Sequence, residues 1–338
     1  MPGLHSDPVT VGRPVRRDDA DGLFRHVMVC LDRSPRAVHI LEQASALATL
    51  AGADLTAIRV VPGGAPGSRC ADPVDWELSR REEVADLMRT AEVAGAAPGV
   101  EPVVACGAAA RCVEEAALRR NVDLLAIGSG AFATPHHWGL GGTARHLAET
   151  FHGSVLVVPD EAAGEPPRER RVIVPMDGSA PAEAALRYAV AIARARGAEL
   201  VILHAVPEGG LLRPGRTGED DSPLWRDLRE EAERLADARL ARLRRLLPVD
   251  AKDHRMRRLD DDEPRRALNR AICEERGDLV VLAARGLGKD PELPIGSTAE
   301  YLLSRAATPV LLVRKGGATA HRASVQAPRR PAAAWQAR

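Results

Sequence analysis

Short apolar runs alternate with segments of helical periodicity along most of the chain. In the first half, runs rich in Val, Ile, Leu and Ala predict strands at 26–31, 54–61, 100–105, 123–128 and 154–158. Apolar residues that recur every three or four positions predict helices at 35–51, 77–93, 109–120 and 142–150. We expect the first helix to be capped by Ser34, to start at Pro35 and to end before Gly52. This alternation is typical of a parallel sheet with helices on both faces.

The second half repeats this order. Strands are predicted near 171–176, 199–206, 253–258, 278–283 and 309–313, with a long helix over 223–247. Asp177 ends its strand 145 residues after Asp32 (177 − 32), and 278–283 follows 123–128 at an offset of 155 (278 − 123). The second copy therefore carries a ten-residue insertion, expected between its second strand and second helix. A repeat of this length indicates a duplicated domain rather than a solenoid.

These patterns predict two domains of ordinary size in a chain of 338 residues. The first domain spans 26–159 and the second spans 171–314. The segment 160–170 is charged and contains Pro, as linkers do. Residues 1–25 lack periodicity and 315–338 are rich in Ala, Arg and Pro, so we expect both ends to be disordered.

Charge and cysteine content narrow the function classes. Lys plus Arg and Asp plus Glu both number 47, which argues against a broad basic surface for nucleic acid or for a membrane. The five cysteines have no CxxC pair and no framework spacing, so we expect unpaired residues in a reducing cytoplasm. No apolar run is long enough to span a bilayer. The histidines at 136, 137, 146 and 152 have no Cys or carboxylate at a recognised ligand spacing, so no metal site is expected.

The loop after the fourth strand of each copy carries the candidate chemistry. In doubly wound sheets, ligands bind at the carboxyl ends of the strands, where the strand order reverses. Nine residues separate Gly286 from Gly296 in the second copy, and nine separate Ala131 from Gly141 in the first. Each loop ends in a small-residue turn that opens a helix, where free N–H groups favour a phosphate.

These residues resemble the universal stress protein family. In its nucleotide-binding members the loop reads Gly, two residues, Gly, nine residues, then Gly before Ser or Thr. The Asp that ends the first strand and the terminal strand at 309–313 are similar too, and the resemblance covers both copies. It implies an α/β fold of two doubly wound parallel five-stranded sheets, each of order 3-2-1-4-5 and adenine nucleotide alpha hydrolase-like. It also implies ATP or another adenine nucleotide as ligand, with or without Mg²⁺.

The resemblance assigns binding positions in both copies. In the second copy Asp177 would contact ribose, and Pro175 and Ala205 would line the adenine pocket. The loop positions implied there are Ala283, Arg285, Gly286, Gly296, Ser297 and Thr298. The matching positions of the first copy, expected to bind more weakly, are Asp32, Val60, Gly128, Gly141, Gly142 and Thr143.

Departures from the family loop favour the second copy as the main site. Ala283 replaces the first glycine there and adds a methyl group that would crowd the nucleotide. In the first copy Ala131 replaces the second glycine, which costs about 1 kcal/mol or more if a positive φ is needed. Gly142 replaces the Ser and loses a hydroxyl that would bind phosphate.

Three functions remain open from the sequence. The first is a cytoplasmic stress-response regulator that binds an adenine nucleotide and acts on a protein partner. The second is a scaffold of the same family that has lost the nucleotide, with a crevice filled by side chains such as Trp138. The third is an enzyme, limited to slow ATP hydrolysis because no nucleophile–base pair is visible. The terminal strands at 154–158 and 309–313 could pair within one chain as a pseudo-dimer, or between chains as a homo-oligomer.

Overall fold

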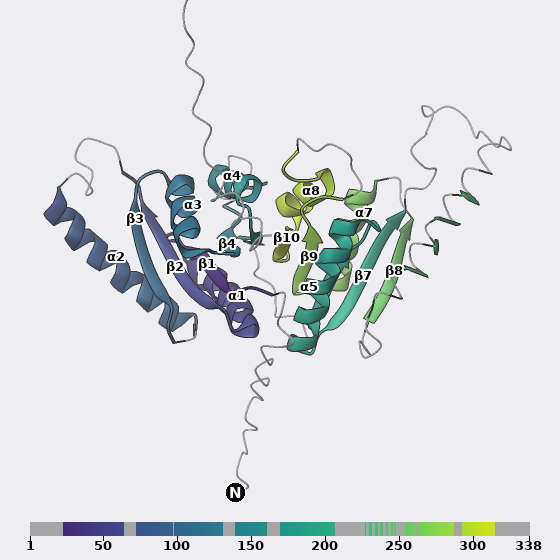
Figure 1. Ribbon diagram of the computed structural model, residues 1–338, viewed down its shortest axis with the longest axis horizontal. Coiled ribbons are helices and arrows are strands. Elements are labelled where there is room, and N and C mark those ends of the chain that lie inside the picture. The colour runs from purple at the N-terminus through teal and green to yellow at the C-terminus, as the bar shows by residue number, and fades with distance from the viewer. Residues whose placement is uncertain are drawn as a thin grey trace, which may run out of the picture.

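The computed structural model describes residues 23–63, 72–96, 98–130, 139–160, 170–206, 254–260, 263–286 and 293–314, and single positions between 227 and 247. We call 23–160 the first half and 170–314 the second half (Figure 1). The elements of the first half are β1 (His26–Cys30), α1 (Ala37–Ala51), β2 (Asp54–Val61), α2 (Pro73–Val93), β3 (Glu101–Cys106), α3 (Ala109–Arg120), β4 (Leu124–Gly128), α4 (Gly142–Thr150) and β5 (Ser154–Val158). Those of the second half are β6 (Arg171–Pro175), α5 (Ala180–Arg196), β7 (Glu199–Val206), β8 (His254–Asp260), α7 (Pro264–Glu275), β9 (Leu279–Ala283), α8 (Ser297–Arg305) and β10 (Val310–Val313).

All ten strands form one sheet, of order β3-β2-β1-β4-β5-β10-β9-β6-β7-β8. Within each half every neighbouring pair is parallel, and each half has the order 3-2-1-4-5. The fold class expected from the sequence is therefore confirmed. In each half the strand order reverses between the first and fourth strands, so β1 and β4, and β6 and β9, flank the crevices where ligands bind in such sheets.

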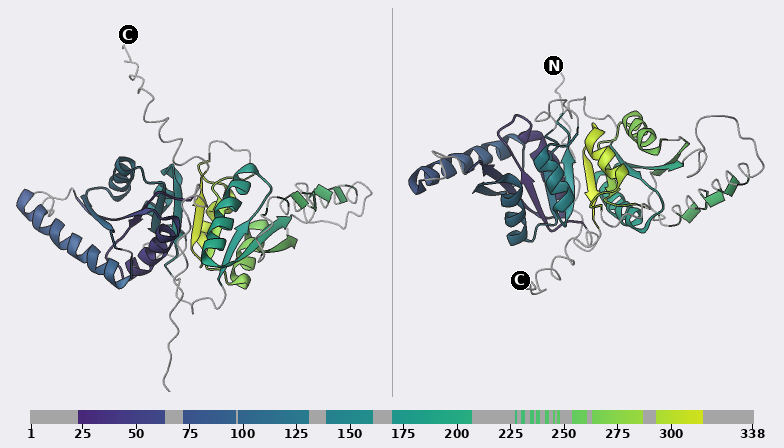
Figure 2. Two further views of the ribbon diagram at one scale, coloured as in Figure 1. Left: turned by 60° about the horizontal axis from the view of Figure 1, so that its bottom comes forward. Right: turned by 90° about the horizontal axis from the view of Figure 1, so that it is seen from above.

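The two halves join through β5 and β10, which pair antiparallel within the chain. Leu311 lies opposite Leu156, and Val310 and Leu312 lie opposite Val157 and Val155. At the offset of 155 residues Leu311 is the counterpart of Leu156, so a pseudo-twofold axis passes through this pair. Figure 2 shows the two strands side by side at the centre of the molecule. Of the two arrangements that the sequence left open, the structure contains the pairing within one chain.

Helices cover both faces of this sheet. One apolar core lies beneath α1, α2 and α5, and the other lies beneath α3, α4, α7 and α8. Successive strand residues alternate between the two, as the pleat requires: Val27 and Val29 belong to the first core and Met28 to the second. Each core contains residues of both halves, so the seam is buried like the interior of a domain.

Some boundaries differ from those expected. Helix α1 begins at Ala37 with Arg36 as its N-cap, and Ser34 makes no capping hydrogen bond, so the Ser34 cap and the Pro35 start are wrong. Ser34 Oγ instead donates to Asp32 Oδ1 at 2.6 Å. Gly52 ends the helix in the left-handed conformation, as expected. Helix α2 begins at Pro73 rather than near 77, because the Asp72 carboxylate accepts hydrogen bonds from the N–H groups of its first turn.

The remaining expectations concern the cysteines and the chain segments between elements. Cys106 is disulfide-bonded, so the expectation of unpaired cysteines is wrong for this residue, and Cys30, Cys112 and Cys273 are free thiols. None of the helices in the described ranges is long and apolar enough to cross a bilayer. The ten-residue insertion, most of the linker, residues 1–22 and residues 315–338 lie outside the described residues. Residues 23–25, expected to be disordered, are described, and Phe24 is buried in the first core, so the expectation is wrong for them.

Candidate functional site

The end of β6 and the loop after β9 meet in the second half. Asp177 follows β6, and its Oδ1 accepts a hydrogen bond of 2.9 Å from the N–H of Ser179, the residue that caps α5. A Cβ built on Gly286 would overlap Asp177 Oδ2, so the carboxylate lies directly against the glycine. The structure thus brings together Asp177 and Gly286, two of the binding positions predicted for the second half. Gly286 lacks a left-handed backbone, so a glycine is needed here for space and not for its φ angle.

The turn before α8 closes the same loop. The N–H of Gly296 donates to Ala284 O at 2.8 Å, and Gly296 is the N-cap of the helix. Ser297 and Thr298 are the first two helical residues, and no side chain caps this end of the helix by a hydrogen bond. Their backbone N–H groups belong to the first turn, which has no partner inside the helix and carries the positive end of the helix dipole. This arrangement can bind a phosphate through backbone donors.

Ala283, which replaces the first glycine of the family loop, is the last residue of β9. Its methyl group packs against the apolar core that contains Ala185 of α5. In the first half the counterparts are Gly128 and Ile40, and a Cβ on Gly128 would lie 2.8 Å from Ile40 Cδ1. The strand position is thus Ala in the second half and Gly in the first, while the helix position is Ala in the second half and Ile in the first.

The other predicted residues of the second half have different surroundings. Pro175 is buried and pairs with Leu203, while Ala205 is half-buried in β7 and Arg285 is exposed. His204 of β7 is buried, and its Nδ1 lies 2.7 Å from the carbonyl oxygen of Met176, which follows β6.

The first half repeats the loop closure with a different lining. The N–H of Gly141 donates to Ser129 O at 2.8 Å, matching Gly296 and Ala284. Gly142 and Thr143 are exposed, and a Cβ on Gly142 would meet nothing within 4 Å. Ala131 and Trp138, which the sequence analysis singled out, lie outside the described residues.

A buried carboxylate lies beside Gly128 in the first half. Asp160 follows β5, and its side chain is 5% exposed. Its Oδ2 lies 3.2 Å from Arg36 Nη1, and a Cβ on Gly128 would lie 3.9 Å from its Oδ1. A phosphate bound against Gly128 would therefore face a negative charge as well as the guanidinium that neutralises it.

A pocket of about 400 Å³ opens beside Asp32. It is lined by Asp32 and Arg33 after β1, by residues 59–62 at the end of β2, and by Ser79 and Glu83 of α2. Val60, which the sequence assigned to the adenine pocket of this half, is part of this lining. The predicted pair of Asp32 and Val60 therefore borders one open cavity.

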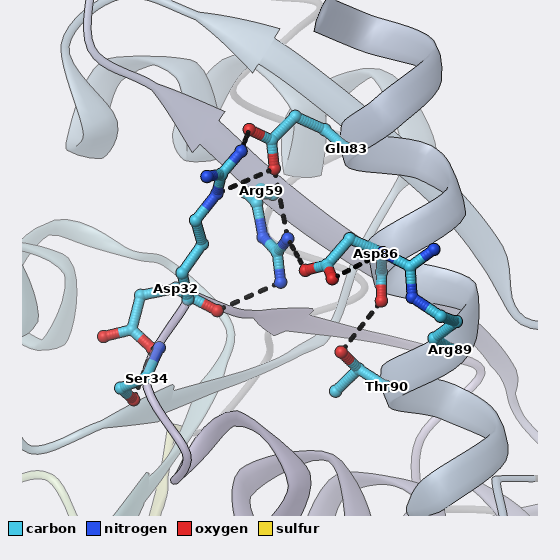
Figure 3. A network of polar contacts seen from close by, with 8 residues as sticks. Asp32, Ser34, Arg59, Glu83, Asp86, Arg89 and Thr90 are labelled. Carbon is cyan, nitrogen blue, oxygen red and sulfur yellow. Dashed lines mark hydrogen bonds and ion pairs between the residues drawn. The ribbon is translucent and has the colours of Figure 1, made fainter.

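An ion-pair network joins residues that line this pocket to Asp86 of α2 (Figure 3). Arg59 is 3% exposed; its Nη1 donates to Glu83 Oε2 at 3.1 Å and to Asp86, and its Nη2 donates to Asp32 O at 3.1 Å. Arg33 also pairs with Glu83. Burial raises the pKa of Glu83, but the hydrogen bonds from the two arginines outweigh it and hold the pKa below its ordinary value.

Sequence reasoning missed Arg33, Arg59, Ser79, Glu83 and Asp86. One signal was present: Arg59 is a charged residue flanked by Ile58 and Val60 within a strand, and such a residue is buried only with partners. The partners lie on α2, whose position against β2 follows from tertiary packing and not from local pattern.

Comparison with known proteins identifies the family. The model of the family described as "Universal stress protein family" matches residues 23–159 and 169–314, which is most of the chain. The chain belongs to the universal stress protein family. The double match agrees with the two halves described above and confirms the tandem arrangement expected from the repeat.

Individual relatives agree with this assignment. A universal stress protein of Mycobacterium tuberculosis is 31% identical over 176 residues, which is 52% of this chain and 53% of the relative. The chain thus spans about half the length of that mycobacterial relative. A universal stress protein of Thermus aquaticus is 33% identical over 147 residues, 43% of this chain and 98% of the relative. The crystal structure of a universal stress protein from Archaeoglobus fulgidus has a TM-score of 0.57 at 18% identity and covers 86% of this chain and 98% of its own, which supports the fold.

Proposed function

We propose that this universal stress protein binds ATP or a related adenine nucleotide in its second half, and that occupancy regulates its action on a protein partner in the cytoplasm. The observation that supports this most directly is the position of the Asp177 carboxylate, which lies where a Cβ on Gly286 would be. In the proposed complex this carboxylate binds the ribose, and the phosphates lie against the backbone that ends at the α8 N-terminus. Arg285, exposed beside that backbone, adds a cation for the phosphates.

Thermal denaturation with and without nucleotide tests the proposal. A ligand that binds only the folded state stabilises it by about 2.7 kcal/mol at a hundred times its Kd. We expect ATP, ADP or AMP at millimolar concentration to raise the Tm of the wild-type protein. Titrations with Mg²⁺ and with EDTA would then establish whether the metal accompanies the nucleotide.

Two glycine variants make the test specific. Gly286→Ala places a methyl group on the Asp177 carboxylate and should abolish the nucleotide-dependent rise in Tm. Gly142→Ala is the matched control, because its added Cβ meets open space at an exposed position. If ATP fails to raise the Tm of the wild-type protein, or if Gly286→Ala responds like Gly142→Ala, nucleotide binding at this site is wrong. A nucleotide-independent scaffold would then be the better account.

A further inference from the structure

The outward face of helix α2 has large apolar side chains, which a surface helix normally buries. Four of the seven large apolar side chains that are exposed in the described ranges lie on this helix: Val74, Leu78, Met88 and Val93. Its buried residues include two polar ones: Ser79, Glu83, Leu87 and Ala91. Surface helices usually have the opposite arrangement, because apolar side chains are stabilised by leaving water. Apolar side chains gathered on one exposed helix indicate an interaction surface.

These exposed side chains have the spacing of a coiled coil. Six exposed residues of α2 follow one another at alternating intervals of four and three: Val74, Leu78, Arg81, Ala85, Met88 and Glu92. We call them the outer stripe. An average interval of 3.5 residues keeps such a stripe facing a partner helix along its length. With 3.6 residues per turn, the outer stripe lies on the side of α2 opposite Glu83. Figures 1 and 2 show α2 at one end of the molecule, away from the seam.

The charges beside the outer stripe are complementary to those of a second α2 helix that runs antiparallel. If two stripes pair with position 83 at their common centre, Leu78 of each copy lies opposite Met88 of the other. At this register Asp75 of each copy faces Arg89 of the other, because both residues flank the stripe on the same side. Both side chains are exposed. A parallel pair would place each of these charges against its own copy.

The centre of the same register contains the one basic residue of the stripe. Arg81 of each copy would lie opposite Ala85 of the other, and this small side chain leaves room for the guanidinium. Arg81 is 71% exposed and pairs within its own helix with Glu77, so it is not held by the core. Glu82 follows it near the axis of the pair, where it is close to Arg81 of the other copy. A charge at the centre is therefore met by an opposite charge.

We propose that a second copy of this chain docks on the outer stripe, so that two chains form a symmetric dimer through antiparallel α2 helices. The same residues of both copies build such an interface, as twofold symmetry requires. The other pairing expected from the sequence, through the terminal strands, is already made within the chain by β5 and β10. A helix of 21 residues is about 31 Å long, so the interface belongs to the small class and the dimer dissociates on dilution. Nothing in this contact depends on nucleotide binding in the second half.

Sedimentation velocity of the full chain, from micromolar to near-millimolar concentration, tests the proposal. The wild-type protein should shift from monomer to dimer. Leu78→Glu puts a charge into the stripe and should weaken the dimer at least ten-fold. Leu118→Glu, the same substitution at an exposed leucine of α3, is the matched control and should dimerise like the wild type. A wild-type protein that stays monomeric, a series of species larger than a dimer, or a dimer that survives Leu78→Glu would each overturn the proposal.

Charge reversal tests the orientation of the two helices. Asp75→Arg should weaken the dimer roughly five-fold, since the antiparallel pair contains the contact with Arg89 twice. The double variant D75R/R89D restores opposite charges in an antiparallel pair and should dimerise like the wild type. Circular dichroism of the dilute monomers checks that each variant is folded. A double variant that stays as weak as Asp75→Arg, or a single variant as strong as the wild type, would refute the antiparallel contact.

Discussion

Arg314 ties the second half to a helix of the first, and its removal offers a quantitative test of how the halves are joined. It follows β10, and its guanidinium reaches across the seam to the C-terminal end of α4. Nη1 donates to Phe151 O at 2.8 Å and to Gly153 O at 3.4 Å, while Nη2 donates to Ala148 O and, at 3.4 Å, to Glu149 O. The last carbonyl groups of a helix have no partner within it, so the guanidinium acts as a C-cap supplied by the other half.

The expected cost follows from these contacts. Hydrogen bonds that involve a charged group contribute about 1.5–3 kcal/mol, and a cation at a helix C-terminus adds up to about 2 kcal/mol when partly buried. Burial lowers the pKa of Arg314 to about 10, with a further decrease from Arg285, so the group is still charged at neutral pH but has lost much of its hydration. After this desolvation is discounted, we expect Arg314→Met to destabilise the protein by about 2–4 kcal/mol. Met retains an unbranched side chain, so the loss reports on the guanidinium.

Denaturation and hydrogen exchange check this prediction. The Tm should fall by roughly 4–16 °C, given about 2–4 °C per kcal/mol for a large domain. The matched control is Arg111→Ala, which removes an exposed guanidinium paired with Glu115 within one helix and should leave the Tm unchanged. Amide exchange should accelerate in α4 but not in α8. The residue of the first half that is equivalent to Arg314 is Pro159, which has no guanidinium to cap α8. A variant that melts like the control, or that loosens α8 as much as α4, would refute the cross-seam cap.

Three other perturbations follow from the same contacts. Arg145 and Glu300 are equivalent residues of the two halves that pair at 3.3 Å while about half exposed, so Arg145→Glu should cost under about 1 kcal/mol and the exchanged pair R145E/E300R should restore wild-type stability in urea denaturation. Glu83→Gln should cost about 2–4 kcal/mol at pH 7. Because the folded pKa of Glu83 is lowered, its contribution is present above the unfolded value of 4.5 and is lost as the pH falls through the folded value, so the variant and the wild type should converge in stability below pH 4. Gly128→Ala should cost about 1 kcal/mol in the wild type and almost nothing in an Ile40→Val background, which lacks the Cδ1 atom that the new methyl meets; equal costs in both backgrounds would contradict the contact.

The pattern of apolar and polar residues predicted most helices and strands, because the type of each element depends mainly on its own sequence. Helices α3 and α4 and strand β5 have the bounds that periodicity gave them, and the strand order followed from the family resemblance. The main error at α1 has a local cause: the Ser34 hydroxyl donates to the Asp32 carboxylate and does not accept from an N–H group of the first helical turn.

The candidate site was harder to predict because its properties depend on contacts between distant segments. The surroundings of Ala283 depend on α5, which is distant in sequence and packs on β9. The pocket of the first half likewise depends on α2, which brings Ser79 and Glu83 against β2. Glycine spacing predicted the turn that closes the loop before α8, which the Gly296–Ala284 hydrogen bond forms. The charged side chains near the equivalent loop of the first half, such as Arg36 and Asp160, lie outside that loop in the sequence.

The pseudo-twofold seam explains how the two halves could become chemically different while keeping one architecture. In a symmetric dimer of identical chains, a residue on the axis meets its own copy, so a charge there meets a like charge. Duplication removes that constraint, and the chain places Arg145 opposite Glu300. The same freedom is visible away from the axis, where His26 Nδ1 lies 3.1 Å from Arg120 O and its counterpart Arg171 donates to Glu275 O at 2.9 Å, so the contact is kept while the residues change. Since these changes leave the shared core intact, the side chains around the two crevices can differ while the sheet and its seam stay the same.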